Sequence, residues 1–266
     1  MLNLIDVLKG SQLSDKTIKA YARIISKFTK TVDGPLKEIH ARAFLGQIRD
    51  KVSESEYYLT YYALKKLFVD VLNKPFTIDP PDRPSEQYRP VLDFERAKRL
   101  IEWAKHEGSK ATKFYLSLAS TFGFRRAELS MLSERSFDGG YILVPPLKKG
   151  KKRVHKIPEP IEEYVFGFTP KPMSEATMSR FFKGMAKKAG IKIRAKEGWH
   201  SIRRLVVTSL SEAGLNYLII HKFMRWSEGR ENRQLAMVAR YTRMEDDKVD
   251  ALVYQNHPLL RLWEEL

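Results

Sequence analysis

Two segments of the sequence carry cationic side chains at spacings that suit a phosphate group. In WHSIRRL (residues 199–205), His200 and Arg203 lie three residues apart near a predicted helix start, so both face the same way. The positive end of that helix adds to the attraction for an anion. In TFGFRRAELSML (121–132), Arg125 stands three residues before Glu128, whose carboxylate can fix the direction of the guanidinium. Either pattern alone also fits an ordinary ion pair.

Two further segments supply a candidate acid and a candidate nucleophile. The run KKGKKR (148–153) lies between two short apolar or β-branched runs, which predicts a hairpin with a basic tip. A lysine on such a tip can enter the minor groove of DNA and protonate a leaving oxygen, although most charge runs are solvated turns. In VARYTRM, Tyr241 stands between two arginines, and cationic neighbours favour the phenolate. Tyr254 is the alternative nucleophile.

The first part of the chain is predicted to be helical. The segment LSDKTIKAYARIISKFTKTV predicts a helix capped by Ser14, and its apolar face is formed by Ile18, Tyr21, Ile25 and Phe28. Similar patterns predict helices over 36–52 and 53–72. Five prolines between residues 75 and 90 exclude a helix there and predict a linker. We therefore expect a helical domain at 1–74, a linker at 75–90 and a second domain at 91–266, with the boundary near residue 88.

The second domain should be mainly α with a small antiparallel β-sheet. Helical patterns cover 93–108, 111–123, 174–190 and 201–215, the last ending at a Gly214 cap. Between them, residues 139–158 predict the hairpin. The acidic run MEDDKVD (244–250) could be argued into a two-metal site, but no second carboxylate cluster completes it, so we interpret it as a solvated helix face.

Charge points to an anionic partner. Lys and Arg outnumber Asp and Glu by 48 to 32, a formal net charge of +16, and the excess is largest after residue 88, where the count is 34 against 21. Such basicity is typical of nucleic-acid binding. A membrane partner and a secretory signal are not indicated, because no apolar run is long enough, so an intracellular protein is expected. The absence of cysteine excludes disulfides, thiolate nucleophiles and cysteine-based zinc sites.

In their order along the chain, these motifs resemble the tyrosine recombinase (phage integrase) family, with the archaeal, mobile-element or Xer-like integrases nearest. GFRRAEL is similar to the family's G-x-R-x-x-E segment, KKGKKRVHKIP to its lysine hairpin, HSIRR to H-x-L-R, and FMRW to L-G-H/W. The front domain resembles the family's helical, SAM-like core-binding domain. The resemblance assigns a catalytic set of Arg125, Lys149, His200, Arg203, Trp226 and Tyr241, with Lys151 and Lys152 as alternatives for the lysine.

Three positions depart from the family pattern. The interval between Trp226 and Tyr241 is longer than usual, and SEGREN looks like the insertion. Arg225 replaces the glycine that usually precedes the His or Trp. Arg204 stands where many relatives have His, outside the catalytic set. The first departure bears on the assignment of Trp226 more than on that of Tyr241.

The resemblance implies cleavage and rejoining of DNA strands through a 3′-phosphotyrosyl link, with no metal, cofactor or ATP. It also implies a homotetramer on paired DNA sites, monomeric without DNA, whose C-terminal helix docks on a neighbouring protomer or, alternatively, on its own. A type IB topoisomerase and a non-catalytic DNA-binding protein are the alternative functions. The hairpin residues expected to contact DNA are Lys148, Lys151, Lys152 and Arg153.

Overall fold

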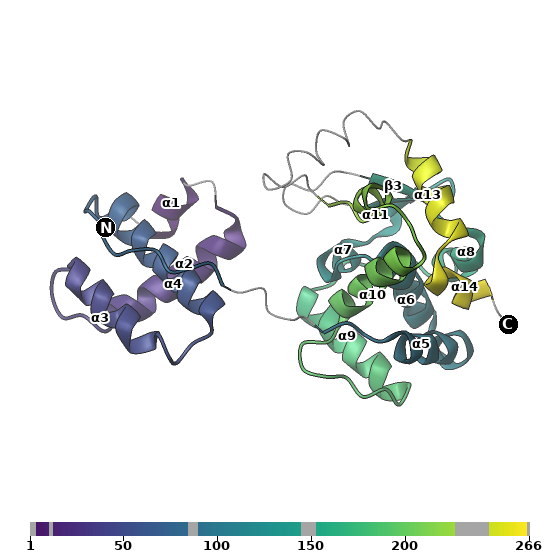
Figure 1. Ribbon diagram of the computed structural model, residues 1–266, viewed down its shortest axis with the longest axis horizontal. Helices are drawn as coiled ribbons and strands as arrows, with labels where there is room; N and C mark the ends of the chain where they lie inside the picture. The colour runs from purple at the N-terminus through teal and green to yellow at the C-terminus, as the bar shows by residue number, and fades with distance from the viewer. Residues whose placement is uncertain (1–3, 11–12, 85–89, 145–152, 227–244, 265–266) are drawn as a thin grey trace. The chain divides into compact units, whose positions relative to one another are not determined.

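A computed structural model describes residues 4–10, 13–84, 90–144, 153–226 and 245–264 (Figure 1). The chain divides into two compact units, Met1–Tyr88 and Arg89–Leu266. Each unit has its own hydrophobic core, so each is considered separately. No helix in these ranges is long and apolar enough to cross a membrane.

The regular elements of the first unit are all helices within the residues that the structure describes. It consists of α1 (Leu4–Lys9), α2 (Asp15–Thr29), α3 (Glu38–Ile48) and α4 (Glu54–Lys66), which continues into the π-helical turn η1 (Leu67–Val71). The Ser14 hydroxyl caps α2 by accepting the backbone N–H of Thr17, as the sequence predicts. The predicted apolar face of α2 is buried in the core of the unit.

The proline-rich segment that the sequence predicts as a linker packs against the first unit over part of its length. The Tyr61 hydroxyl donates to the backbone carbonyl of Ile78 at 2.6 Å, and the ring of Phe76 lies 5.5 Å from that of Tyr61. Thr77 donates its backbone N–H and its hydroxyl to Glu38. Proline excludes a helix here but not burial, because an extended segment can still place apolar side chains against a core.

The second unit is built around a buried helix. Its elements are α5 (Phe94–Glu107), α6 (Lys110–Phe122), α7 (Arg126–Met131), η2 (Glu134–Ser136), β1 (Phe137–Asp138), β2 (Tyr141–Val144), β3 (Arg153–Lys156), α8 (Glu159–Phe166), α9 (Glu175–Lys188), α10 (Trp199–Glu212), α11 (Tyr217–Phe223), α13 (Asp246–Gln255) and α14 (Pro258–Glu264). Helix α6 is buried on nearly every side, and α5, α8, α10 and α14 pack around it (Figure 1).

The small sheet is antiparallel, in the order β1-β2-β3, and its last two strands are the arms of the predicted hairpin. Ile142 pairs with His155, and Val144 with Arg153. Because paired residues share a face, His155 and Arg153 point into the core beside the two apolar side chains. The hairpin tip, with Lys148, Lys149, Lys151 and Lys152, lies outside the described residues.

The C-terminal helix docks on its own chain. Helix α14 packs against α5, α6 and α8, and its four large apolar side chains are buried. The Trp263 indole N–H donates to the Ser120 hydroxyl of α6 at 2.9 Å. Of the two arrangements expected from the sequence, the structure therefore has docking in cis.

His257 joins α13 and α14 to α6, and it makes the stability of the fold depend on pH. Its Nε2–H donates to the Thr121 carbonyl at 2.9 Å, and its Nδ1 accepts the Leu260 N–H at 3.2 Å. Complete burial lowers the pKa of His257 from 6.5 to about 4. Below pH 6.5 the unfolded chain therefore binds a proton at this residue and the folded chain does not, so stability falls as the pH falls towards 4.

We predict that the free energy of unfolding falls by about 2 kcal/mol less in His257→Gln than in the wild type when the pH is lowered from 7 to 5. Glutamine keeps one donor and one acceptor but does not titrate. Urea unfolding at the two pH values measures the difference. The control is His106→Gln, at an exposed position of α5, which should lose as much stability as the wild type. Equal losses in all three proteins would contradict the prediction.

Candidate active site

Arg203 connects three helices at the centre of the site. It lies on the buried face of α10, donates from Nη1 to the Gly123 carbonyl at 2.5 Å, and donates from Nη2 to the Met224 carbonyl at 2.6 Å. Gly123 ends α6 in the left-handed conformation, with φ +58°, which favours glycine, and a Cβ there would also displace the end of the Met224 side chain, whose Cε would lie 2.6 Å away. Burial and the nearby Arg225 and Arg125 lower the pKa of Arg203 to about 9, so it remains cationic at neutral pH.

Arg125 is held in place by Glu128, as its spacing predicts. It caps the start of α7: its backbone N–H donates to Glu128 Oε2 at 2.6 Å and its Nη1 to Oε1 at 2.7 Å. The Arg125 side chain is 30% exposed while that of Glu128 is 2% exposed, so a buried carboxylate holds a guanidinium that is accessible to solvent. Burial alone would raise the pKa of Glu128, but Arg225 and Arg125 hold it below its usual value.

His200 begins α10 on its exposed side. Desolvation by the surrounding chain, then the positive charges of Arg203 and Arg126, lower its pKa below 6.5. Arg204 and Arg125 contribute smaller amounts to the same lowering. The imidazole is therefore neutral at physiological pH and can accept a hydrogen bond or a proton.

Arg225 and Trp226 follow α11. The Trp226 ring is half-buried beside those of His221 and Tyr217, with ring centroids 5.7 and 6.1 Å away. Arg225 adopts the left-handed conformation, with φ +57°, at the position where the family pattern has glycine. Its side chain turns into the core, where it is 4% exposed and lies over the ring of Phe124.

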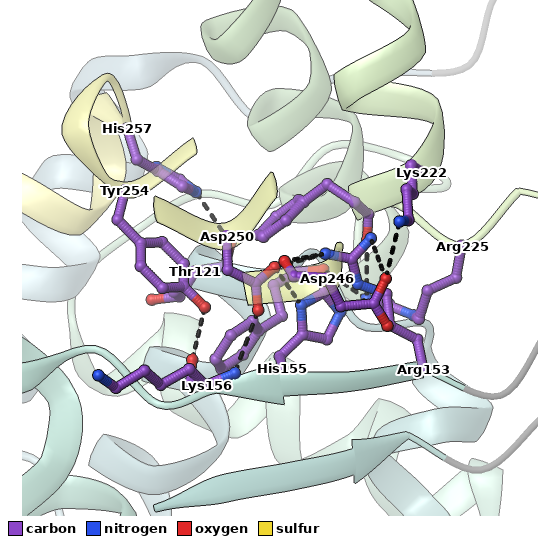
Figure 2. Close-up of polar contacts among 12 residues, drawn as sticks. Thr121, Arg153, His155, Lys156, Lys222, Arg225, Asp246, Asp250, Tyr254 and His257 are labelled. Carbon is purple, nitrogen blue, oxygen red and sulfur yellow. Dashed lines mark hydrogen bonds and ion pairs between the residues drawn. The ribbon is translucent and has the colours of Figure 1, made fainter. Parts of the chain in front are cut away.

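A buried polar network extends from Arg225 in two directions. Its Nη2 donates to Glu128 Oε2 at 3.1 Å, and its Nη1 meets His155 Nε2 at 2.9 Å. On the far side of the ring, His155 Nδ1 lies 3.0 Å from Asp250 Oδ1 on α13 (Figure 2). Asp250 also accepts from Arg153 Nη2 at 2.5 Å and from the Lys156 backbone N–H at 3.1 Å.

His155 fits this network in one protonation state. Burial lowers the pKa of His155 to about 4, although Asp250 opposes the shift, so the ring is neutral. Because Arg225 can only donate, Nε2 must be the acceptor and Nδ1 must carry the proton that Asp250 accepts. A neutral ring thus joins a buried cation to a buried anion.

Two expectations from the sequence are wrong at this network, and the structure also argues against the alternative nucleophile. The acidic run at 244–250 is not simply a solvated helix face, because Asp250 is 1% exposed. Arg153 is 4% exposed and paired with Asp250, which argues against a direct contact with DNA. The Tyr254 hydroxyl donates to the Lys156 carbonyl at 2.5 Å, and burial raises its pKa well above 10, opposite to what a nucleophile requires.

The sequence reasoning missed His155, Asp250 and Arg225 as members of the site. Two signals were present in the pattern. Arg153 and His155 alternate in β3 with the period of a strand, and Asp250 stands between Val249 and Val253 on the apolar face of α13. Tyr241 and the hairpin lysines, including Lys149, lie outside the described residues. In the same described ranges, no three acidic or histidine side chains gather as a metal site requires.

Solved structures share this architecture. A lambda integrase (residues 75–356) bound to DNA matches with a TM-score of 0.67 and 18% identity over 90% of this chain and 94% of that one. The chain has the tyrosine recombinase fold. A lambda integrase tetramer bound to a Holliday junction matches at TM-score 0.66 and 18% identity, over 87% and 74% of the two chains. The Tn1549 transposon integrase in complex with circular intermediate DNA matches with a TM-score of 0.60 and 16% identity, over 92% of this chain and 94% of that one. No protein-family model and no curated protein match the sequence.

We predict that Glu128→Gln lowers the free energy of unfolding by about 3 kcal/mol, because it leaves two guanidinium groups without their shared buried carboxylate. Glutamine has nearly the same shape, so the effect reports charge. Urea unfolding at neutral pH measures it. Glu134→Gln, at an exposed position of η2, is the matched control and should stay within about 0.5 kcal/mol of the wild type. Similar losses in the two variants would contradict a special role for Glu128.

Proposed function

We propose that the protein is a site-specific DNA recombinase, an integrase that cleaves and rejoins DNA strands through a 3′-phosphotyrosyl intermediate. The observation that carries the proposal is that Arg203 is hydrogen-bonded to the end of α6 next to Arg125, with His200 one turn before Arg203 on α10, in a chain with the tyrosine recombinase fold. Arg203 binds the carbonyl two residues before Arg125, and the charges of both arginines act on His200. Two cations and a neutral base in this arrangement suit a phosphodiester.

In the proposed reaction, the Tyr241 oxygen forms a bond to phosphorus, and the bond from phosphorus to the 5′-oxygen breaks. The tyrosine proton passes to His200 or to solvent, while a hairpin lysine, Lys149 or alternatively Lys151 or Lys152, protonates the 5′-oxygen. The phosphotyrosyl link keeps the energy of the broken bond. Rejoining is the same step in reverse, so the proposed reaction requires neither ATP nor a metal.

The two arginines have a common role in this proposal. Negative charge concentrates on the two non-bridging oxygens during attack, and Arg125 and Arg203 donate hydrogen bonds to them. Loss of one such donor should raise the barrier by roughly 3 kcal/mol, or about 100-fold in rate. Trp226 contributes its N–H or packs against the phosphate.

Double-stranded DNA is the proposed partner. Lys148, Lys151 and Lys152 supply phosphate contacts in this proposal, and the matching lambda and Tn1549 integrase structures contain bound DNA. We further propose that the active assembly is a homotetramer on two DNA sites, since one of the matching structures is a lambda integrase tetramer bound to a Holliday junction. Because α14 is docked in cis, contacts between protomers would use other surfaces. The proposed natural setting is a mobile element.

A covalent adduct tests the function. We predict that a suicide DNA substrate, which loses a short fragment after cleavage, traps the wild type in a complex stable to SDS. Tyr241→Phe should form none. Arg203→Lys should form it about 100-fold more slowly, because lysine cannot reproduce the forked contacts.

Tyr254→Phe is the matched control and should still form the adduct, since its hydroxyl is bound to a backbone carbonyl. An adduct that persists in Tyr241→Phe and is lost in Tyr254→Phe would contradict the assignment. Relaxation of a supercoiled plasmid without any joining of two sites would indicate a type IB topoisomerase instead.

Affinity for DNA should depend steeply on salt. If binding rests on phosphate neutralisation by the basic second unit, affinity should fall about a thousandfold between 50 and 200 mM salt. Fluorescence anisotropy with a labelled duplex measures this fall. Lys148→Ala should reduce the logarithmic salt slope by about 1 if the lysine contacts a phosphate. A nearly constant affinity across this range would contradict the charge argument.

A further inference from the structure

The segment Met224–Arg225 is linked to both of the arginines that are proposed to bind the phosphate. The Met224 carbonyl accepts from Arg203 Nη2 at 2.6 Å. The Arg225 side chain donates to Glu128 Oε2 at 3.1 Å, and the other oxygen of Glu128 accepts from Arg125 Nη1. This short segment after α11 therefore contacts Arg203 directly, and it is connected to Arg125 through the Glu128 carboxylate.

We propose that Arg225 is a positioning residue: through Glu128 it holds the Arg125 guanidinium in the direction that the developing charge on the phosphate requires. The proposal rests on the proposed recombinase function. Arg225 itself is buried and does not reach a substrate, so its effect on the reaction must pass through Glu128.

The geometry of Glu128 makes this transmission direct. Its Oε1 is used by the Arg125 side chain, and its Oε2 is shared between the Arg125 backbone N–H and Arg225 Nη2. Both oxygens thus have fixed directions, and the carboxylate cannot rotate without losing a charged hydrogen bond in a buried place. Without Arg225, one of the three restraints on Glu128 is lost.

Arg225 is held on its far side as well. Its Nη1 binds neutral His155, which is bound in turn to Asp250 on α13 (Figure 2). Its backbone is in the left-handed conformation, which a non-glycine residue adopts only when the surroundings enforce it. Side-chain contacts and backbone conformation therefore both fix the guanidinium that faces Glu128.

The test compares two DNA substrates. One has an ordinary scissile phosphate, and the other has a methyl group in place of one non-bridging oxygen, which removes the negative charge. The ratio of adduct-formation rates on the two substrates measures how much the enzyme uses that charge, and Arg125→Ala provides the reference for its loss. A protein that is merely less stable reacts more slowly with both substrates and keeps the wild-type ratio.

We expect Arg225→Met to slow adduct formation on the ordinary phosphate by about 10- to 100-fold, since small misplacements have effects of this size. The methylated substrate should be affected far less, so the ratio moves towards that of Arg125→Ala, while affinity for DNA stays within about threefold. Arg96→Met is the matched control, because Arg96 is also a largely buried, ion-paired arginine, but its partners are Asp93 and Glu197. It should keep the wild-type ratio.

His155 provides a second route if Arg225→Met does not fold. His155→Leu removes the acceptor for Arg225 Nη1 and should lower the ratio of the rates on the ordinary and methylated substrates. His155→Gln offers an amide oxygen as the acceptor and should keep this ratio closer to the wild-type value. The inference is overturned if Arg225→Met or His155→Leu slows both substrates equally. A wild type that forms no adduct on the ordinary phosphate would instead overturn the proposed function, and this inference with it.

Discussion

The ionised carboxylate of Glu128 is the interaction on which the rest of the site depends. A carboxylate that is 2% exposed is stable only if cations and hydrogen bonds replace its lost hydration. Here Arg125 and Arg225 supply both, from the start of α7 and from the end of α11. Any displacement of either element would leave a buried charge uncompensated, so separating the two elements is costly, although a well-packed apolar contact could stabilise the fold as much.

The same arrangement leaves an excess of positive charge. Three guanidinium groups, those of Arg125, Arg203 and Arg225, act on one another around a single carboxylate, and the described contacts of Arg203 are with backbone carbonyls only. Burial and this mutual repulsion lower the pKa of Arg203 to about 9 and that of Arg225 to about 10. A bound phosphate would supply the missing negative charge. In the proposed reaction, this excess of positive charge is in place before any substrate arrives, as the stabilisation of a phosphoryl transition state requires.

Sequence reasoning identified the parts of the site whose partners are local. The pairing of Arg125 with Glu128 and the cap at Ser14 depend on residues three apart, and the glycine turn before α7 is a matter of backbone conformation. The network of Arg225, His155 and Asp250 joins residues 70 and 95 positions apart, and no local spacing specifies it. Its charged members resemble solvated surface groups in a one-dimensional pattern. Only the packing of β3 against α13 shows that their charges are neutralised by one another.

The contrast between two tyrosines follows from the same physics. Tyr254 donates its proton to the Lys156 carbonyl and lies beside Asp250, so both burial and the nearby negative charge favour the neutral phenol. A nucleophile needs the opposite surroundings, with cations that favour loss of the proton. In the sequence, Tyr241 has arginines at positions 240 and 243. Tyr254 instead fastens α13 to β3, next to the network that holds Arg225 in place, and it contributes to the site as a structural residue.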